Sequence, residues 1–133
     1  MKLIVDANIL FSLVKEDSTA SLILKKHNPK LFAPKFALDE LSKYKDELIE
    51  KSDFDSLSPA LTSLKNKVSF IEESEYRKFL SYSQIKVSDP KDMAYLALSI
   101  KLKSPIWSND PHLKEQSFIE VFTTSELLEL FEA

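Results

Sequence analysis

The chain of 133 residues contains no cysteine and no glycine. Without cysteine it can form neither disulfides nor thiolate metal sites, and it has no cysteine nucleophile. Without glycine it cannot carry the glycine-rich loop that binds dinucleotides, nor the loop that binds the phosphates of ATP and GTP. The absence of glycine therefore excludes nucleotide-cofactor enzymes that depend on either of these two loops.

Histidine and net positive charge are also scarce. Histidine occurs only at positions 27 and 112, too few for an all-histidine zinc site. The net charge of −3 argues against nucleic-acid binding driven by overall basicity. Lysines still cluster locally, although such clusters are usually solvated helix faces. The clusters are Lys25, Lys26, Lys30 and Lys35, then Lys43 and Lys45, then Lys101 and Lys103.

Long hydrophobic runs are missing as well. No run approaches the roughly 18 to 20 apolar residues that span a bilayer. The first apolar run stops at Asp6, which is unlike a signal peptide. We therefore expect a cytoplasmic protein without membrane contact. The length and the ordinary composition, 44% apolar and 29% charged, predict one domain over residues 1–133.

Short apolar runs alternate with segments of helical periodicity. This alternation predicts an α/β fold, a three-layer sandwich with a parallel sheet of about five strands covered by helices on both faces. Strands are predicted at residues 2–6, 30–34, 68–72, 105–108 and 119–123. Helices are predicted at residues 8–15, 18–27 (with Asp17 or Ser18 as N-cap), 36–51, 54–67, 75–85, 87–103 after an initial turn, and 125–133.

Two acidic residues, Asp6 and Asp110, lie at or just past the carboxyl ends of predicted strands. Ligands of parallel sheets bind outside this edge. Glu40 lies early in the helix after the second strand, and Asp92 lies in the first turn of a long apolar helix. Each acid alone has an ordinary explanation. Asp6 and Asp92 could serve helix termini, Asp110 could be a turn residue before proline, and Glu40 could be solvated.

The arrangement of the four acids is more specific than any one of them, because all four can converge at one rim of the sheet. Close carboxylates raise one another's pKa, so a fold retains such a cluster only if a cation fills it. Oxygen ligands without histidine or cysteine suit Mg²⁺ or Mn²⁺. Carboxylate-bound ions can activate water for phosphodiester hydrolysis. We therefore predict these residues as metal ligands and catalytic groups: Asp6, Glu40, Asp92 and Asp110.

The segments DPKDMAYLALS around Asp92 and IWSND ending at Asp110, with Asp6, Asn8 and Glu40 in order before them, resemble a PIN domain over nearly the whole chain. That family consists of metal-dependent nucleases acting mostly on RNA, and it includes the toxins of VapBC toxin–antitoxin pairs. The resemblance implies sheet order 3-2-1-4-5, an acidic pocket of the four acids, and endonucleolytic RNA cleavage with Mg²⁺ or Mn²⁺. It also suggests an antitoxin protein and a homodimer as partners.

The resemblance assigns supporting roles to further polar residues. Asn8 and Ser108 match small polar positions that support ligands or substrate. Asp89 can cap the following helix or add a metal contact, and these two roles stay open. Asp39 competes with its neighbour Glu40 for the second acidic position, although the family pattern favours Glu40.

Two other readings have different functions. A phosphoryl-accepting receiver domain would need a second acid beside Asp6, where Ala7 stands, and a phosphorylatable Asp after strand three. Asp55 is the nearest candidate, but no buried strand precedes it. The third reading is a catalytically silent PIN-like module that binds RNA or protein. The presence of all four acids gives no sign of lost activity.

Overall fold

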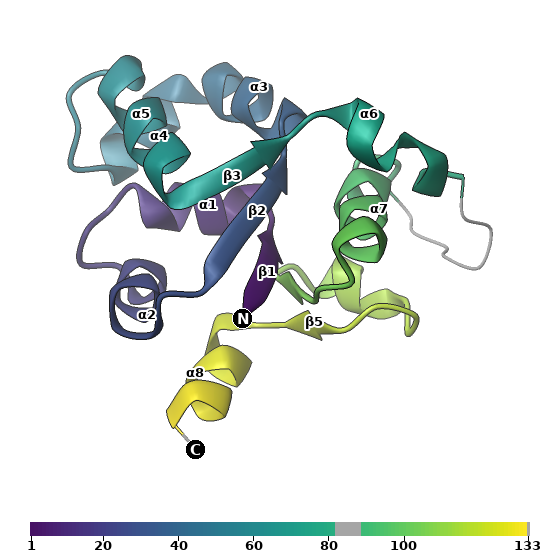
Figure 1. Ribbon diagram of the computed structural model, residues 1–133. Coiled ribbons are helices and arrows are strands. Elements are labelled where there is room, and N and C mark those ends of the chain that lie inside the picture. Colours follow the sequence, from purple (N-terminus) through teal and green to yellow (C-terminus); the bar gives the residue numbers. More distant parts are fainter. Residues whose placement is uncertain (82–88, 133) are drawn as a thin grey trace.

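Five parallel strands form the sheet of the computed structural model, which describes residues 1–81 and 89–132. The order β3-β2-β1-β4-β5 confirms the predicted 3-2-1-4-5 arrangement (Figure 1). Strand order reverses between β1 and β4, so the switch point lies at these neighbouring strands. The strands are β1 (Lys2–Val5), β2 (Lys30–Pro34), β3 (Val68–Ile71), β4 (Ile106–Trp107) and β5 (Val121–Phe122).

Helices cover both faces of the sheet, which confirms the three-layer α/β sandwich (Figure 1). One face is covered by α1 (Ala7–Leu13), α2 (Thr19–His27), α3 (Phe36–Lys43), α4 (Lys45–Lys51), α5 (Leu57–Lys67) and α8 (Thr124–Glu132). The other face is covered by α6 (Glu73–Tyr76) and α7 (Asp92–Leu102), with the 3-10 turns η1 (Arg77–Phe79) and η2 (Pro111–Glu115).

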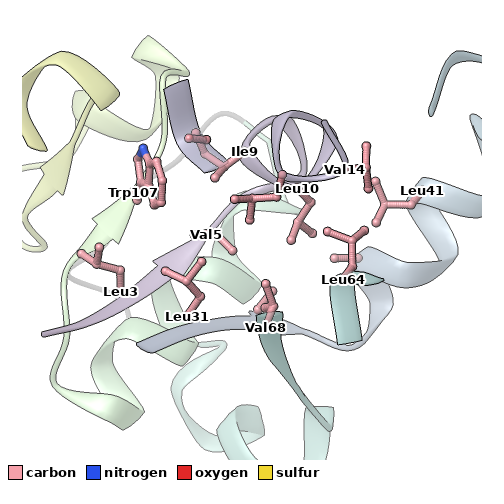
Figure 2. Packing of buried hydrophobic residues seen from close by; sticks show 14 of the residues in the cluster. Leu3, Val5, Ile9, Leu10, Val14, Leu31, Leu41, Leu64, Val68 and Trp107 are labelled. Atoms are coloured by element: carbon pink, nitrogen blue, oxygen red, sulfur yellow. The ribbon is translucent and has the colours of Figure 1, made fainter. Parts of the chain in front are cut away.

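The central strand β1 supplies both hydrophobic cores. Successive side chains of a strand point to opposite faces, so Leu3 and Val5 enter the first core and Ile4 enters the second. Figure 2 shows Leu10 of α1 and Leu64 of α5 packed in the first core. Burial of β1 on both faces, with paired strands on both sides, fixes the position of the residue that follows it.

The predicted helix at residues 36–51 is wrong as a single element. It divides into α3 and α4 at Tyr44, whose backbone (φ −111°, ψ 35°) is not helical. Tyr44 is 54% exposed, while Leu41 and Leu48 on either side of it are fully buried. Neither proline nor glycine marks the break, so it results from packing that periodicity does not report.

Other element boundaries also moved. The helix predicted at 75–85 begins earlier, at Glu73, and tightens into η1 at Arg77, and its residues 82–85 lie outside the described part of the chain. The helix predicted at 54–67 begins only at Leu57. Ser18, rather than Asp17, caps α2, because its Oγ accepts a hydrogen bond from the Ser21 N–H at 3.1 Å.

Two helices end in the left-handed conformation on residues other than glycine. Asn28 (φ 47°) follows α2, and Lys103 (φ 51°) follows α7. Most helices that end this way use glycine, because a Cβ atom costs roughly 1 kcal/mol in that region. Asn tolerates it through its short polar side chain, whereas Lys103 has no such compensation. The Lys103 backbone is therefore held by the turn between α7 and β4.

Leu10→Ala should lower the free energy of unfolding by about 2–5 kcal/mol, because truncating a buried leucine loses apolar burial and leaves a cavity. Leu10 is 0% exposed in the first core. Urea unfolding measures the loss. Leu22→Ala on the outside of α2, where the residue is 54% exposed, is the control and should change stability by less than about 0.5 kcal/mol. Equal losses in the two variants would contradict this core.

Candidate active site at the carboxyl edge of the sheet

A hollow of about 130 Å³ opens at the carboxyl ends of β1 and β4. All four predicted acids line it, together with Asn8 and Asp89, so the fold brings these residues to one hollow. The rival acid Asp39 lines a different hollow, beside α6. The full lining is Asp6, Ala7, Asn8, Phe36, Glu40, Asp89, Lys91, Asp92, Tyr95 and Asp110.

Asp6 forms the floor of the hollow and also begins α1. It is 6% exposed, and its Oδ1 accepts a hydrogen bond from the Ile9 N–H at 3.0 Å, which makes it the N-cap of α1. Its Oδ2 accepts a short hydrogen bond from the Ser108 hydroxyl. Burial raises the pKa of Asp6, the Asp110 charge raises it further, and these hydrogen bonds oppose the rise. Capping and pocket formation thus use different oxygens of one carboxylate.

Ser108 connects the two acids at the strand ends. It is fully buried just after β4, and the pairing of Val5 with Trp107 brings it beside Asp6. While its hydroxyl donates to Asp6, the same oxygen accepts the backbone N–H of Asp110 at 3.0 Å. Ser108 is therefore a positioning residue for both carboxylates.

Asp110 caps the 3-10 turn η2 in addition to lining the hollow. Its Oδ1 accepts the His112 N–H at 2.9 Å and lies 3.1 Å from His112 Nδ1. The His112 side chain is 62% exposed. One carboxylate oxygen of Asp110 is thus engaged by η2.

Asp92, the first residue of α7, is a half-buried acid of the hollow whose pKa is raised. Partial burial raises its pKa to about 6, helped by the negative charges of Asp89, Asp110 and Asp6. The repulsion expected from clustered carboxylates is therefore present at Asp92 itself. Its neighbour Asp89 is turned toward the backbone, where Oδ1 accepts the Lys91 N–H at 3.0 Å. This bond closes the turn before α7, while α7 itself has no side-chain cap, and the metal contact of Asp89 stays a prediction.

Glu40 differs from the other three acids because lysines neutralise it. Its Oε1 lies 3.1 Å from the Lys91 Nζ and 3.9 Å from the Lys43 Nζ. Glu40 is 19% exposed, whereas the Lys91 side chain is 60% exposed. The pKa of Lys91 is raised by its hydrogen bond to Glu40.

Sequence reasoning missed four lining residues, namely Ala7, Phe36, Lys91 and Tyr95. Phe36 and Tyr95 form an apolar wall, with ring centroids 5.7 Å apart in an edge-to-face contact. Burial raises the pKa of Tyr95, and the charges of the nearby acids raise it further. Lys91 stands inside the quoted DPKD motif, so its closeness to Asp92 was available from sequence, whereas its contact with Glu40 depends on the fold.

The carboxylates of the hollow are the ligand type that a hard divalent cation prefers, but their side chains are not arranged around one metal position. Carboxylate oxygens are what Mg²⁺ and Mn²⁺ prefer, and mutual repulsion favours a cation among them. Among residues 1–81 and 89–132, however, no three Asp, Glu or His side chains lie close enough together to hold a metal ion as they stand. Glu40 is paired with Lys91, and one oxygen of Asp110 is engaged by η2.

A second hollow of about 1100 Å³ adjoins the acidic one, sharing Ala7, Asn8 and Glu40 with it. It lies between α1 and α4 and carries the rings of Phe11 and Tyr44. Any polymer cleaved at the acids would find room here for the parts beside the scissile bond.

A family model described as PIN domain matches residues 4–128. The chain belongs to the PIN domain family. Since the match spans nearly the whole chain, this result confirms the resemblance inferred from the motifs around Asp92 and Asp110. A comparison with curated proteins found no match.

This PIN domain is also similar to a solved structure, the VapBC2 proteins from Rickettsia felis bound to a DNA fragment from their promoter. The TM-score is 0.58 at 14% identity, over 92% of this chain and 98% of that chain. At so low an identity, the TM-score shows that the two chains share a fold. The receiver-domain reading is wrong, because such domains have strand order 2-1-3-4-5 and because Asp55 lies between α4 and α5, not after a strand.

The helices described in this PIN domain lie in residues 1–81 and 89–132. None of its helices there combines the length and the apolar character required to cross a bilayer.

Asp92→Asn should stabilise the metal-free PIN domain at pH 7.5 and have no effect near pH 4. Because the folded pKa of about 6 exceeds the ordinary 3.8, the folded state binds the proton more tightly, and stability falls as pH rises from about 4 to 6. Above that window the variant should gain about 1 kcal/mol, a value reduced for solvent screening of this half-buried group.

Urea unfolding in EDTA at both pH values measures this difference between wild type and variant. Asp39→Asn, which removes an exposed acid of α3 outside the hollow, is the matched control. A stabilisation of Asp92→Asn that is equal at both pH values would show that charge repulsion is not its cause.

Proposed function

We propose that this PIN domain is a Mg²⁺- or Mn²⁺-dependent endoribonuclease. The observation that carries the proposal is that four acids, chosen from sequence alone, line one hollow at the switch point of the sheet. Membership of a nuclease family supports the same reaction class. The proposed metal-holding and catalytic residues are Asp6, Glu40, Asp92 and Asp110.

In this proposal the carboxylates hold the cation and the chain supplies no nucleophile of its own. When bound, Mg²⁺ or Mn²⁺ would activate water and neutralise charge on the phosphodiester. Ser108 keeps Asp6 and Asp110 at fixed positions through its two hydrogen bonds. Asn8 is exposed at the junction of the two hollows, where its amide can orient a substrate phosphate or sugar. Asp89 is a further candidate ligand if its side chain turns into the hollow.

Single-stranded RNA fits the larger hollow better than a duplex does. Unstacked bases can stack on aromatic rings, and Phe11 and Tyr44 offer two such rings beside the acids. The phosphates cannot be held there by lysine alone, because Lys15 and Lys51 are outnumbered by Glu47, Glu50 and Asp53. Base stacking is therefore proposed as the main contact in this hollow.

The biological setting follows from the family and is part of the proposal. We infer a cytoplasmic toxin whose activity a cognate antitoxin protein restrains, with a homodimer as the assembly. Co-expression with the product of the adjacent gene, followed by purification of a complex, would test the antitoxin. The alternative is a catalytically silent PIN module. The pocket does not favour this alternative, since all four acids are present at the hollow.

Asp6→Asn should reduce cleavage of a fluorescent single-stranded RNA in Mn²⁺ at least 100-fold, because it removes a metal-holding charge. Asn is as good an N-cap as Asp, so α1 and the melting temperature should be preserved. Gel analysis with an EDTA lane and a DNA strand of the same sequence measures the reaction and its preference for RNA. Asp39→Asn should cleave like wild type. Full activity of Asp6→Asn, or activity in EDTA, would refute the proposed chemistry.

Millimolar Mn²⁺ should raise the melting temperature, because an ion bound only by the native state stabilises it by RT ln(1 + [Mn²⁺]/Kd). Differential scanning fluorimetry in the absence of RNA measures the shift. The shift should be lost in Asp6→Asn and retained in Asp39→Asn. A melting temperature independent of Mn²⁺ in the wild type would remove the metal site.

A further inference from the structure

Lys91 places a positive charge inside the acidic hollow. Its side chain lines the hollow, and its Nζ lies 3.1 Å from Glu40 Oε1. Lys43 also approaches Glu40, at 3.9 Å, but it does not line the hollow. The charges of Glu40 and Asp89 both act on Lys91. Of the two lysines that neutralise Glu40, only Lys91 does so from within the hollow.

The backbone of Lys91 is fixed next to the acids. It stands between Pro90 and Asp92, immediately before α7, and its N–H donates to Asp89 Oδ1 at 3.0 Å. Its side chain therefore starts beside Asp92 and crosses to Glu40 on α3. This contact links the residue before α7, the helix that begins with Asp92, to α3, the helix that carries Glu40.

The contact also explains why the acids do not form a ready-made cation site. In the described residues no three carboxylates converge, and Glu40 is the acid with an ammonium group against it in the hollow. A divalent ion that takes Glu40 as a ligand has to displace this ammonium group, since both need the same carboxylate. Lys91 and the ion are thus competitors for one position.

We propose that Lys91 is the resident cation of the hollow: it holds Glu40 while no divalent ion is bound, is displaced from Glu40 by the ion, and then contacts a phosphate oxygen of the substrate. The inference rests on the proposed nuclease function and adds a substrate-binding residue to it. An ammonium group released beside Asp92 lies next to the acids, where a phosphodiester would approach them. Lysine is suited to this exchange, because it is a compact charge on a flexible stem.

Mn²⁺ binding without RNA tests the first half. Lys91→Gln should lower the Kd for Mn²⁺, fitted from the dependence of the melting temperature on Mn²⁺ concentration, about fivefold, the range of a partly exposed ion pair. Lys91→Arg, which keeps the charge, should stay within twofold of wild type. Lys43→Gln removes the same unit charge from the vicinity of Glu40 but lies outside the hollow, and should also stay within twofold.

The outcomes separate this inference from the proposed function. If wild type shows no Mn²⁺-dependent stabilisation, the metal site itself fails. If wild type is stabilised by Mn²⁺ but Lys91→Gln has the wild-type Kd for Mn²⁺, or the Kd changes as much in Lys43→Gln as in Lys91→Gln, competition at Glu40 is refuted. Circular dichroism of each variant before titration checks that its total helix content equals that of wild type.

Steady-state cleavage of short RNA at saturating Mn²⁺ tests the second half. Lys91→Gln should raise KM about fivefold or more and change kcat less than twofold, because a lost phosphate contact weakens substrate binding. Lys91→Arg should recover most of the wild-type KM. An unchanged KM in Lys91→Gln would refute the phosphate contact.

Discussion

The hydrogen bond from the Ser108 hydroxyl to the buried Asp6 carboxylate joins the ends of β1 and β4. Burying a carboxylate is costly unless hydrogen bonds satisfy it, and Asp6 obtains these from Ser108 and from the first turn of α1. The start of α1, the alignment of the two strands and the floor of the hollow therefore depend on one side chain. Because Ser108 also holds the Asp110 backbone, displacement of either strand would move both acids.

Electrostatic repulsion is the second constraint, and the fold meets it unevenly. The pKa values of Asp6 and Asp92 are raised by burial and by neighbouring carboxylates, whereas Glu40 receives a lysine. Carboxylate repulsion is thus concentrated at the ends of β1 and α7, whereas at α3 a lysine offsets the negative charge. Raised carboxylate pKa values in a cleft are typical of functional sites, since stability alone would favour removing the charges.

The sequence was sufficient to locate the five strands, whereas their order was implied by the resemblance to a PIN domain, and the acids of the hollow were predicted without Phe36, Lys91 and Tyr95. Apolar runs marked the strands, and acids directly after them had to meet at one edge. Periodicity was insufficient at Tyr44, where tertiary packing breaks a helix without proline or glycine. The bond from Lys91 to Glu40 was equally hidden, because it joins α7 to α3 through space and neither residue alone signals a partner.

A chain without glycine has a consequence for its unfolded state. Every residue here carries a Cβ atom, so the denatured ensemble has fewer accessible backbone conformations, and folding loses less entropy than in a chain of ordinary composition. The cost appears instead in the native turns, where Asn28 and above all Lys103 adopt left-handed backbone angles. The strand β4 begins three residues after Lys103, and Ser108 directly follows that strand. The absence of glycine thus has two effects: backbone strain at Lys103 in the native state, and lower conformational entropy of the unfolded chain.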